Sequence, residues 1–346
     1  MLVGIWLTSL ALAALSVAVM AFLVLVRVIA TWGEKRREAR RAALLATVFA
    51  WFDGKVEDAA IEAEMARHSK TAVTLVIEIF ELMRGADQIR LAELATRCGL
   101  ADRLRHQLAS RKPAERLQAA ESLIWFPSDE TEAALRMALK DRREDVRLAA
   151  AASLAELGAA VPVSQILGMG SAGTKGSSRR LEATLTKLAD RQATDLSRIA
   201  ADGNLPDRVR AAAIDAIART GAFEFLRPIA ALAADRSETV RAAVAHALGD
   251  FAHPLGADAV TRLLDDPDWK VRAEAAEAAG RIGLIDLADR LSDLLGDEVW
   301  WVRFRAGGAL VSLGETGVEK LRLQSISTLD TNRRTAALIL AERGLA

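Results

Sequence analysis

An arginine recurs along this chain at an almost constant interval. Successive members of the series are 31 residues apart, with a single gap of 32. The series consists of Arg116, Arg147, Arg179, Arg210, Arg241, Arg272, Arg303 and Arg334. A fixed period of about 20–50 residues is typical of repeat proteins, in which each small unit stacks on the next. The chain is therefore constrained to a linear array of about eight similar units.

Residues at other positions recur at the same interval of about 31 residues. Six residues before the arginine, most units carry a side chain that turns or caps a chain. This column holds Ser110, Asp141, Gly173, Asn204, Asp235, Asp266, Asp297 and Thr328. Eleven residues after the arginine, Gly158, Gly221, Gly283 and Gly314 are of the kind that ends a helix. Apolar residues between these points recur at steps of three and four, so each unit is predicted to be a helical hairpin and the fold to be all-α.

These motifs resemble the HEAT repeat family, in the short bacterial form that also occurs in phycobilin lyase-like proteins. The matching stretches are "DRREDVRLAAAASLAELG", "NLPDRVRAAAIDAIARTG", "DDPDWKVRAEAAEAAGRIG" and "DEVWWVRFRAGGALVSLG". The resemblance covers residues 86–346 and implies an α-solenoid of HEAT-like units. It also implies that the arginines form a structural ladder, pairing with acids and carbonyls of neighbouring turns. The unit at 161–190 departs from the pattern, with Gly173 in the capping column and the stretch "GMGSAGTKGSS".

The first 26 residues contain no charged side chain. About 20 apolar residues cross the ~30 Å hydrocarbon layer of a membrane, so this run is long enough to span one. A cleaved signal peptide is the competing interpretation, but such a peptide carries basic residues before its apolar run. Here the basic residues follow the run, as Arg27, Lys35, Arg36, Arg37, Arg40 and Arg41. The sequence therefore predicts an uncleaved transmembrane anchor within residues 1–32.

The same basic residues predict the orientation of the anchor. Lys and Arg beside a membrane span stay on the cytoplasmic side, so the N-terminus should face outward and the repeats should lie in the cytoplasm. Cys98 is the only cysteine, which excludes an intramolecular disulfide. A composition rich in Ala and Arg and without Tyr favours a bacterial inner membrane.

Residues 33–85 are predicted to form a helical connector and an N-terminal cap. The segment from Arg36 to Trp51 has basic residues first and then "AALLATVFAWF". It could lie on anionic lipid as an amphipathic helix, or Val48, Trp51 and Phe52 could pack against the helices that follow. The stretch "SKTAVTLVIEIFELM", which begins at Ser69, is apolar nearly all round but too short to span a membrane. We expect it to seal one end of the array.

Charge and motifs point away from catalysis and nucleic acid. The 46 basic and 46 acidic residues cancel, whereas a nucleic-acid binder needs a basic stripe. The four histidines, His68, His106, His246 and His253, include no pair at the i, i+4 spacing of a helical metal site. The glycine-rich stretch lacks the Gly-Lys-Ser/Thr of a phosphate-binding loop. No catalytic residue, metal, cofactor or small-molecule substrate is predicted, and the protein is not expected to be an enzyme.

Tryptophans mark the best candidate for partner binding. Trp269 and Trp300 both lie three residues before the recurrent arginine, in adjacent units, and Trp301 follows directly. Tryptophan and arginine dominate interaction hot spots, so Trp269, Trp300, Trp301 and Arg305 are the predicted partner-binding residues. Alternatively, the tryptophans fill gaps between units.

Together these features predict a membrane-anchored cytoplasmic scaffold that binds protein partners at the membrane. Assembly or regulation of an envelope machine, such as a polysaccharide synthase, is the setting we expect. The resemblance leaves one alternative, a lyase-like enzyme or a tetrapyrrole chaperone related to the phycobilin lyases. The predicted anchor and the absence of an acid–base pair favour the scaffold.

Overall fold

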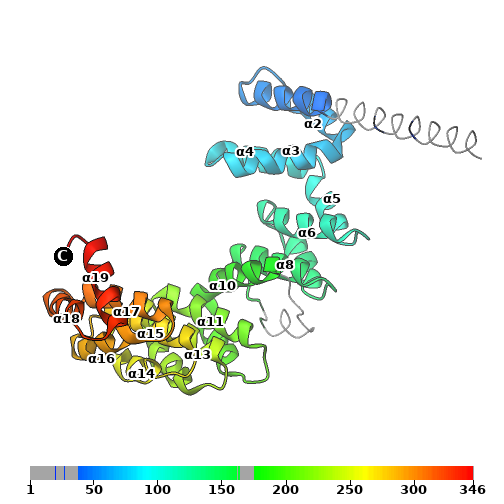
Figure 1. Cartoon of the computed structure of the whole chain (residues 1–346). Coiled ribbons are helices and arrows are strands. Elements are labelled where there is room, and N and C mark those ends of the chain that lie inside the picture. Colours follow the sequence, from blue (N-terminus) through cyan, green and yellow to red (C-terminus); the bar gives the residue numbers. More distant parts are fainter. Residues whose placement is uncertain (1–19, 21–26, 28–37, 162, 164–174, 346) are drawn as a thin grey trace, which may run out of the picture. The chain divides into compact units, whose positions relative to one another are not determined.

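The computed structural model describes residues 20, 27, 38–161, 163 and 175–345. Every regular element in this part of the chain is a helix, which confirms the prediction of an all-α fold (Figure 1). The contacts divide the chain into two units. Unit 1 comprises Met1–Arg111 with Trp125–Thr131, and unit 2 comprises Lys112–Ile124 with Glu132–Ala346. The start of the repeat array at residue 86 stays a prediction.

The predicted membrane span falls on residues 1–32, which lie outside the described residues except for Met20 and Arg27. Among the residues that are described, no helix has both the length and the apolar character needed to cross a bilayer. The anchor and its orientation therefore stay predictions.

Unit 1 is built around the apolar segment predicted to be a cap. Its helices are one over residues 38–52, α2 (Asp58–Arg67), α3 (Ser69–Leu82), α4 (Ala86–Arg97) and α5 (Leu100–Gln107). Helix α3 contacts α2, α4 and α5, and this burial on several sides explains its nearly continuous apolar sequence. Near its end, the ring of Phe80 stacks on Trp125 with centroids 5.3 Å apart and meets Phe126 edge-on at 5.8 Å.

The helix over 38–52 packs within unit 1. Leu44 and Val48 are fully buried, and Trp51 is buried with its Nε1 donating to Asp58 Oδ1 at 2.7 Å. Arg41 forms an ion pair with Glu78 of α3. Of the two alternatives left open by the sequence, packing against the following helices is the one observed.

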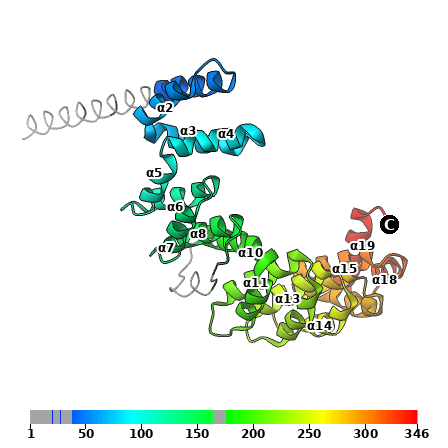
Figure 2. The same cartoon turned by 180° about the vertical axis from the view of Figure 1, so that it is seen from behind.

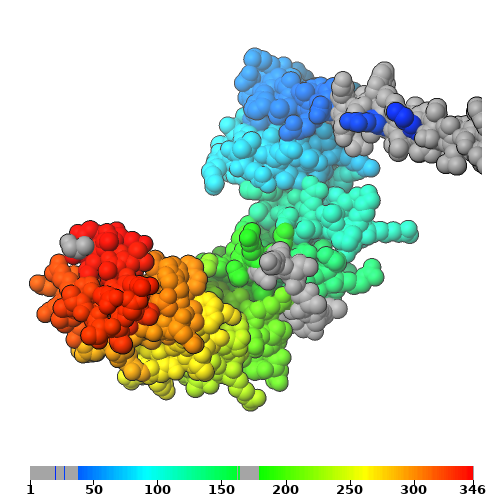
Figure 3. Space-filling model, viewed as in Figure 1, coloured from blue at the N-terminus to red at the C-terminus, as the bar shows by residue number. Residues whose placement is uncertain are grey.

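Unit 2 is a succession of helical hairpins whose second helices stack in chain order. Figures 1 and 2 show this succession for α11, α13 and α15, and Figure 3 shows the C-terminal helices packed against them. The longer helices are α6 (Pro113–Ser122), α7 (Asp129–Ala138), α8 (Glu144–Glu156), α10 (Lys175–Ala201), α11 (Asp207–Thr220), α12 (Leu226–Ala231), α13 (Glu238–Phe251), α14 (Ala257–Leu263), α15 (Trp269–Ile282), α16 (Ala288–Asp293), α17 (Trp300–Ser312), α18 (Glu315–Ser325) and α19 (Asp330–Glu342). Short 3₁₀ turns, η1 to η6, join or extend several of them. The second helices are α6, α8, α11, α13, α15, α17 and α19, together with the first part of α10.

Small residues allow these helices to pack closely. The alanine three residues after the arginine is fully buried in α8, α11, α15 and α17. At Gly280 of α15, an added Cβ would lie 2.7 Å from the Cα of Ala309 in α17. The two backbones are therefore too close for even a methyl group at this point.

An arginine–aspartate ladder connects successive hairpins. Its complete rungs join Arg116 to Asp141, Arg210 to Asp235, Arg241 to Asp266, and Arg272 to Asp297. In the third rung, Arg241 Nε and Nη2 donate to the two carboxylate oxygens of Asp266 at 2.7 and 2.8 Å. Its Nη1 donates to Asp235 O, in the turn of its own unit, at 2.9 Å. Each such arginine thus fixes its own turn and the turn of the next unit.

The aspartate of each rung also caps a turn. Asp266 Oδ1 accepts from the backbone N–H of Asp268 at 2.9 Å. Burial alone would raise the pKa of Asp266, but the hydrogen bonds from Arg241 and from that N–H outweigh it and lower the pKa. The stabilisation is therefore present above the ordinary pKa and is lost as the pH falls through the lowered one.

Two arginines of the predicted ladder lie outside it. Arg179 is exposed, and Leu181, two residues later, is buried instead. Arg334 is also exposed and pairs with Asp330 of its own helix. In that last unit, Arg333 Nη1 lies 3.4 Å from Ser327 O. These residues are six positions apart, as are the arginine and the turn carbonyl that it contacts at Arg241 and Arg272. The spacing assumed in the sequence is therefore one residue off in the last unit, and it fails at Arg179 in the third.

We expect loss of a rung to weaken the array substantially. Arg272→Ala would leave the carboxylate of Asp297, whose side chain is 7% exposed, without its guanidinium. The free energy of unfolding should fall by about 2–4 kcal/mol, because a buried charge loses its partner. Arg334→Ala removes an exposed arginine and should change it by no more than about 0.5 kcal/mol. Urea denaturation of both variants measures this, and equal small effects would show that the rungs contribute little.

Candidate interaction surface

The second helices of unit 2 share a face on which side chains of neighbouring hairpins meet. We define this second-helix face by the positions two, five and nine residues after the ladder arginine. On α8 these are Ala149, Ala152 and Glu156; on α13, Ala243, His246 and Asp250; on α15, Glu274, Glu277 and Arg281; and on α17, Arg305, Gly308 and Ser312. Their chemistry changes along the array, from small residues to charged ones.

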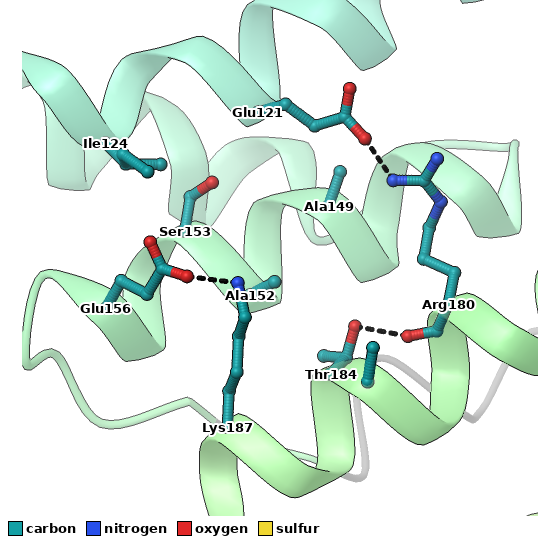
Figure 4. Close-up of a pocket in the computed structure, with 10 residues that line it drawn as sticks. Glu121, Ile124, Ala149, Ala152, Ser153, Glu156, Arg180, Thr184 and Lys187 are labelled. Atoms are coloured by element: carbon teal, nitrogen blue, oxygen red, sulfur yellow. Dashed lines mark hydrogen bonds and ion pairs between the residues drawn. The ribbon is translucent and has the colours of Figure 1, made fainter. Parts of the chain in front are cut away.

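Over α8 the small residues leave a groove, shown in Figure 4. It has a volume of about 180 Å³, and Ala149 and Ala152 are among the residues that line it. Two ion pairs flank it, because Arg180 and Lys187 extend from α10 to Glu121 and Glu156 respectively. Pockets for small molecules typically measure about 300–1,000 Å³, so this groove is better matched to a single side chain of a protein partner.

Further along the same face, a charged cluster joins α13, α15 and α17. His246 Nδ1 lies 3.3 Å from Glu274 Oε2, and its Nε2 lies 3.6 Å from Asp250 Oδ2. Arg281 donates to Asp250 Oδ1 at 2.6 Å. Arg305, predicted from the sequence to bind a partner, pairs here with the acids Glu274 and Glu277 of α15.

Asp215 of α11 is a half-buried acid beside this cluster. Its Oδ1 is buried and has no hydrogen-bond partner. Burial raises the pKa of Asp215 to about 6, although His246 and Arg219 act in the opposite direction. The pKa of His246 is also raised, chiefly by its hydrogen bond with Glu274. The carboxyl of Asp215 therefore titrates near pH 6, and the hydrogen bond with Glu274 favours the protonated form of His246.

The tryptophans lie at the start of the second helices. Trp300 and Trp301 are 46% and 50% exposed, and Trp269 is 37% exposed. The ring of Trp300 stacks on Phe304 with centroids 5.1 Å apart and an interplanar angle of 17°. Trp301 meets Trp300 edge-on at 4.8 Å. We call Trp300, Trp301 and Phe304 the aromatic cluster.

The sequence-predicted site is thus only partly assembled. Trp300 and Trp301 come together, whereas Trp269 lies on α15 with Lys270 Nζ 6.0 Å from its ring centroid. Phe304 was missed, although its position four residues after Trp300 places it on the same side of a helix.

A family model described as HEAT repeats matches residues 194–267 and 257–341. In this segment the chain resembles HEAT repeats. The segment contains three of the four complete rungs, the charged cluster and the aromatic cluster. No curated protein sequence matches the chain.

Several solved structures are similar to the chain at low identity. Kap121p bound to Pho4p is 14% identical with a TM-score of 0.45, over 78% of this chain and 37% of that one. A second structure of Kap121p is 12% identical with a TM-score of 0.43, over 88% of this chain and 49% of that one. YibA of E. coli is 16% identical with a TM-score of 0.42, over 76% and 99%. The chain spans less than half the length of the Kap121p chains, and the HEAT assignment is based on the family model alone.

Asp215 should make the array less stable as the pH rises. Its folded pKa of about 6 lies above the ordinary 3.8, so its contribution is most favourable below 3.8 and is lost as the pH rises through 6. Asp215→Asn should therefore raise the free energy of unfolding by roughly 1–3 kcal/mol at pH 8, and by much less at pH 4.

The raised pKa of His246 gives wild type and variant the same trend, so the difference between the two proteins is the quantity to measure. Asp190→Asn, at an exposed position of α10, is the matched control and should show no pH-dependent gain. An Asp215→Asn effect that is equal at pH 4 and pH 8 would contradict the titration assigned to Asp215.

Proposed function

We propose that this protein is a scaffold that binds protein partners through its HEAT repeats, held at the cytoplasmic face of a membrane by an anchor in residues 1–32. The observation that carries the proposal is the exposed aromatic cluster on a packed helix. HEAT-repeat proteins generally act as interaction scaffolds, and proteins built of stacked repeats use extended surfaces for binding.

The aromatic cluster has the properties of a binding anchor. About half of each tryptophan is exposed, although these side chains bury large apolar areas when a partner covers them. The three rings support one another, so little side-chain freedom remains to be lost on binding. The helix that carries them is held by Val302 and Ala306, both fully buried.

Membrane attachment makes moderate affinity sufficient. A tether raises the effective concentration of the scaffold near membrane partners, so binding of modest strength gives high occupancy. The charge-free run of 26 residues followed by basic residues supports the anchor. An envelope machine such as a polysaccharide synthase is the setting we propose, because its subunits occupy the same membrane. No structural observation favours the lyase or tetrapyrrole-chaperone alternative.

Loss of the tryptophans should remove partners without unfolding the array. Trp300→Ala with Trp301→Ala should weaken partner binding by about 2 kcal/mol or more, roughly 30-fold. The melting temperature should fall much less than for a buried aromatic, since both rings are half exposed. Quantitative pull-down from membranes, followed by titration of the purified partner, measures the first effect.

Phe223→Ala is the matched control, because Phe223 is an exposed aromatic (57%) of a different hairpin. It should retain the partners. Full partner retention by the double tryptophan variant, with a collapsed melting temperature, would assign the tryptophans to packing alone.

The anchor predicts a defined topology. A reporter that is active only in the periplasm, fused after residue 346, should be silent, and one active in the cytoplasm should work. Deletion of residues 2–30 should move the protein from the membrane fraction to the soluble fraction. A mature chain that begins near Thr31, or an active periplasmic fusion, would contradict the proposed location but would leave the aromatic cluster as a binding site.

A further inference from the structure

At Arg303 the ladder lacks the carboxylate that the complete rungs have. At Arg116, Arg241 and Arg272, the Nε–Nη2 edge of the guanidinium holds both oxygens of an aspartate in the next unit. Arg303 of α17 comes next. Its Nη1 donates to Asp297 O at 2.8 Å and to Glu298 O at 3.1 Å, as at the other rungs. Its Nε, however, is buried and has no hydrogen-bond partner.

The sequence of the last unit explains why the carboxylate is absent. Ser327 Oγ accepts from the N–H of Leu329 at 3.2 Å, as Asp297 Oδ1 accepts from the N–H of Val299 at 2.8 Å. Ser327 therefore occupies the capping position of the aspartates, but its hydroxyl is shorter and uncharged. Thr328, which the constant spacing would place there, is exposed. Arg303 thus keeps the turn contact of a rung and has lost its carboxylate.

Open space and two further arginines lie near the turn that follows this rung. Arg333 and Arg334 share one carboxylate, that of Asp330. A hollow of about 400 Å³ lies between the end of η6 and the start of α19, lined by Asp293, Gly296, Leu329, Asp330, Thr331 and Asn332. Of its two acids, Asp330 is the one held by the two arginines, and Asp293 is exposed. Space therefore adjoins the turn in which the carboxylate is missing.

We propose that Arg303 binds a carboxylate of a partner protein, an Asp or Glu side chain that completes the rung. The planar guanidinium matches a carboxylate in a two-point contact, which the four complete rungs show in this same array. A buried donor without a partner costs stability, and an incoming carboxylate removes that cost. This inference rests on the proposed function and deepens it, because it specifies an acidic group in the partner.

The aromatic cluster offers apolar contacts to the same partner segment. In α17, Trp301 lies two residues before Arg303 and Phe304 directly after it, and Trp300 stacks on Phe304. The segment that binds here should therefore combine an acidic side chain with apolar ones. A free small carboxylate has the same chemistry, so the experiment includes it as a separate arm.

The decisive variant supplies the missing group from within the chain. Ser327→Asp places a carboxylate at the capping position, where it should pair with Arg303 as Asp297 pairs with Arg272. We expect its melting temperature to rise by about 2–4 °C. Thr328→Asp adds the same charge at the neighbouring exposed position and should leave the melting temperature unchanged. If the melting temperature did not rise with Ser327→Asp, or rose equally with both variants, the inference that Arg303 lacks a carboxylate partner would be overturned.

Sodium acetate is the probe for the open rung. At constant ionic strength it should raise the melting temperature of the wild type relative to chloride, but not that of Ser327→Asp or of Arg303→Gln. An equal shift in all three proteins would show a general salt effect and overturn the anion site.

Partner binding is the second arm. Ser327→Asp should lose the partners that the wild type captures, although it is more stable, because its own carboxylate occupies Arg303. If it lost its acetate response and still retained every partner, Arg303 would bind free carboxylates and the partner assignment would be overturned. Partners lost with the tryptophan variant but kept with Ser327→Asp would leave the proposed function standing without this inference.

Discussion

The paired contact between an arginine and the aspartate 25 residues later determines most of the architecture of unit 2. The aspartate caps its own turn through a backbone N–H, while its two oxygens hold the guanidinium of the preceding hairpin. The arginine in turn fixes the carbonyls of the turn before it. The same interaction therefore fixes the turn of one unit and the stacking of the next unit on it. Because each hairpin contacts mainly its neighbours, stability is built up interface by interface.

The constant step also aligns positions that do not hold the array together. Small residues near the centre of each second helix let the backbones approach, as at Gly280 and Ala309. The positions of the second-helix face are then free to vary from hairpin to hairpin. Alanines leave a groove over α8, charged side chains cover α13 and α15, and aromatic rings collect at the start of α17. One repeated scaffold thus presents different chemistry along its length.

Periodicity predicted the helical hairpins and the arginines of the complete rungs, because those residues depend on a spacing that the sequence displays. It placed Arg179 and Arg334 in the ladder as well, and the structure shows why spacing was insufficient. Helix α10 runs from the third unit into the fourth through a kink at Gln192, and the last unit is one residue out of step. Phe304 and Asp215 were missed for another reason. Equivalent columns of the repeats carry no signal for either residue, because Phe304 contacts Trp300 within one helix and the burial of Asp215 depends on neighbouring helices.

Asp215 Oδ1 and Arg303 Nε are both buried polar atoms without a partner, and both lie on second helices within the HEAT-repeat segment. Each costs stability. At Asp215 an asparagine, which has the same shape, would remove the charge that burial disfavours. Natural sequences depart from the most stable choice mainly where another requirement acts on the same residue. At Arg303 the requirement that we propose is partner binding, because the unpaired guanidinium edge and the exposed rings lie within two turns of α17. A partner that supplies a carboxylate and covers the rings would satisfy the buried donor and bury the apolar surface together.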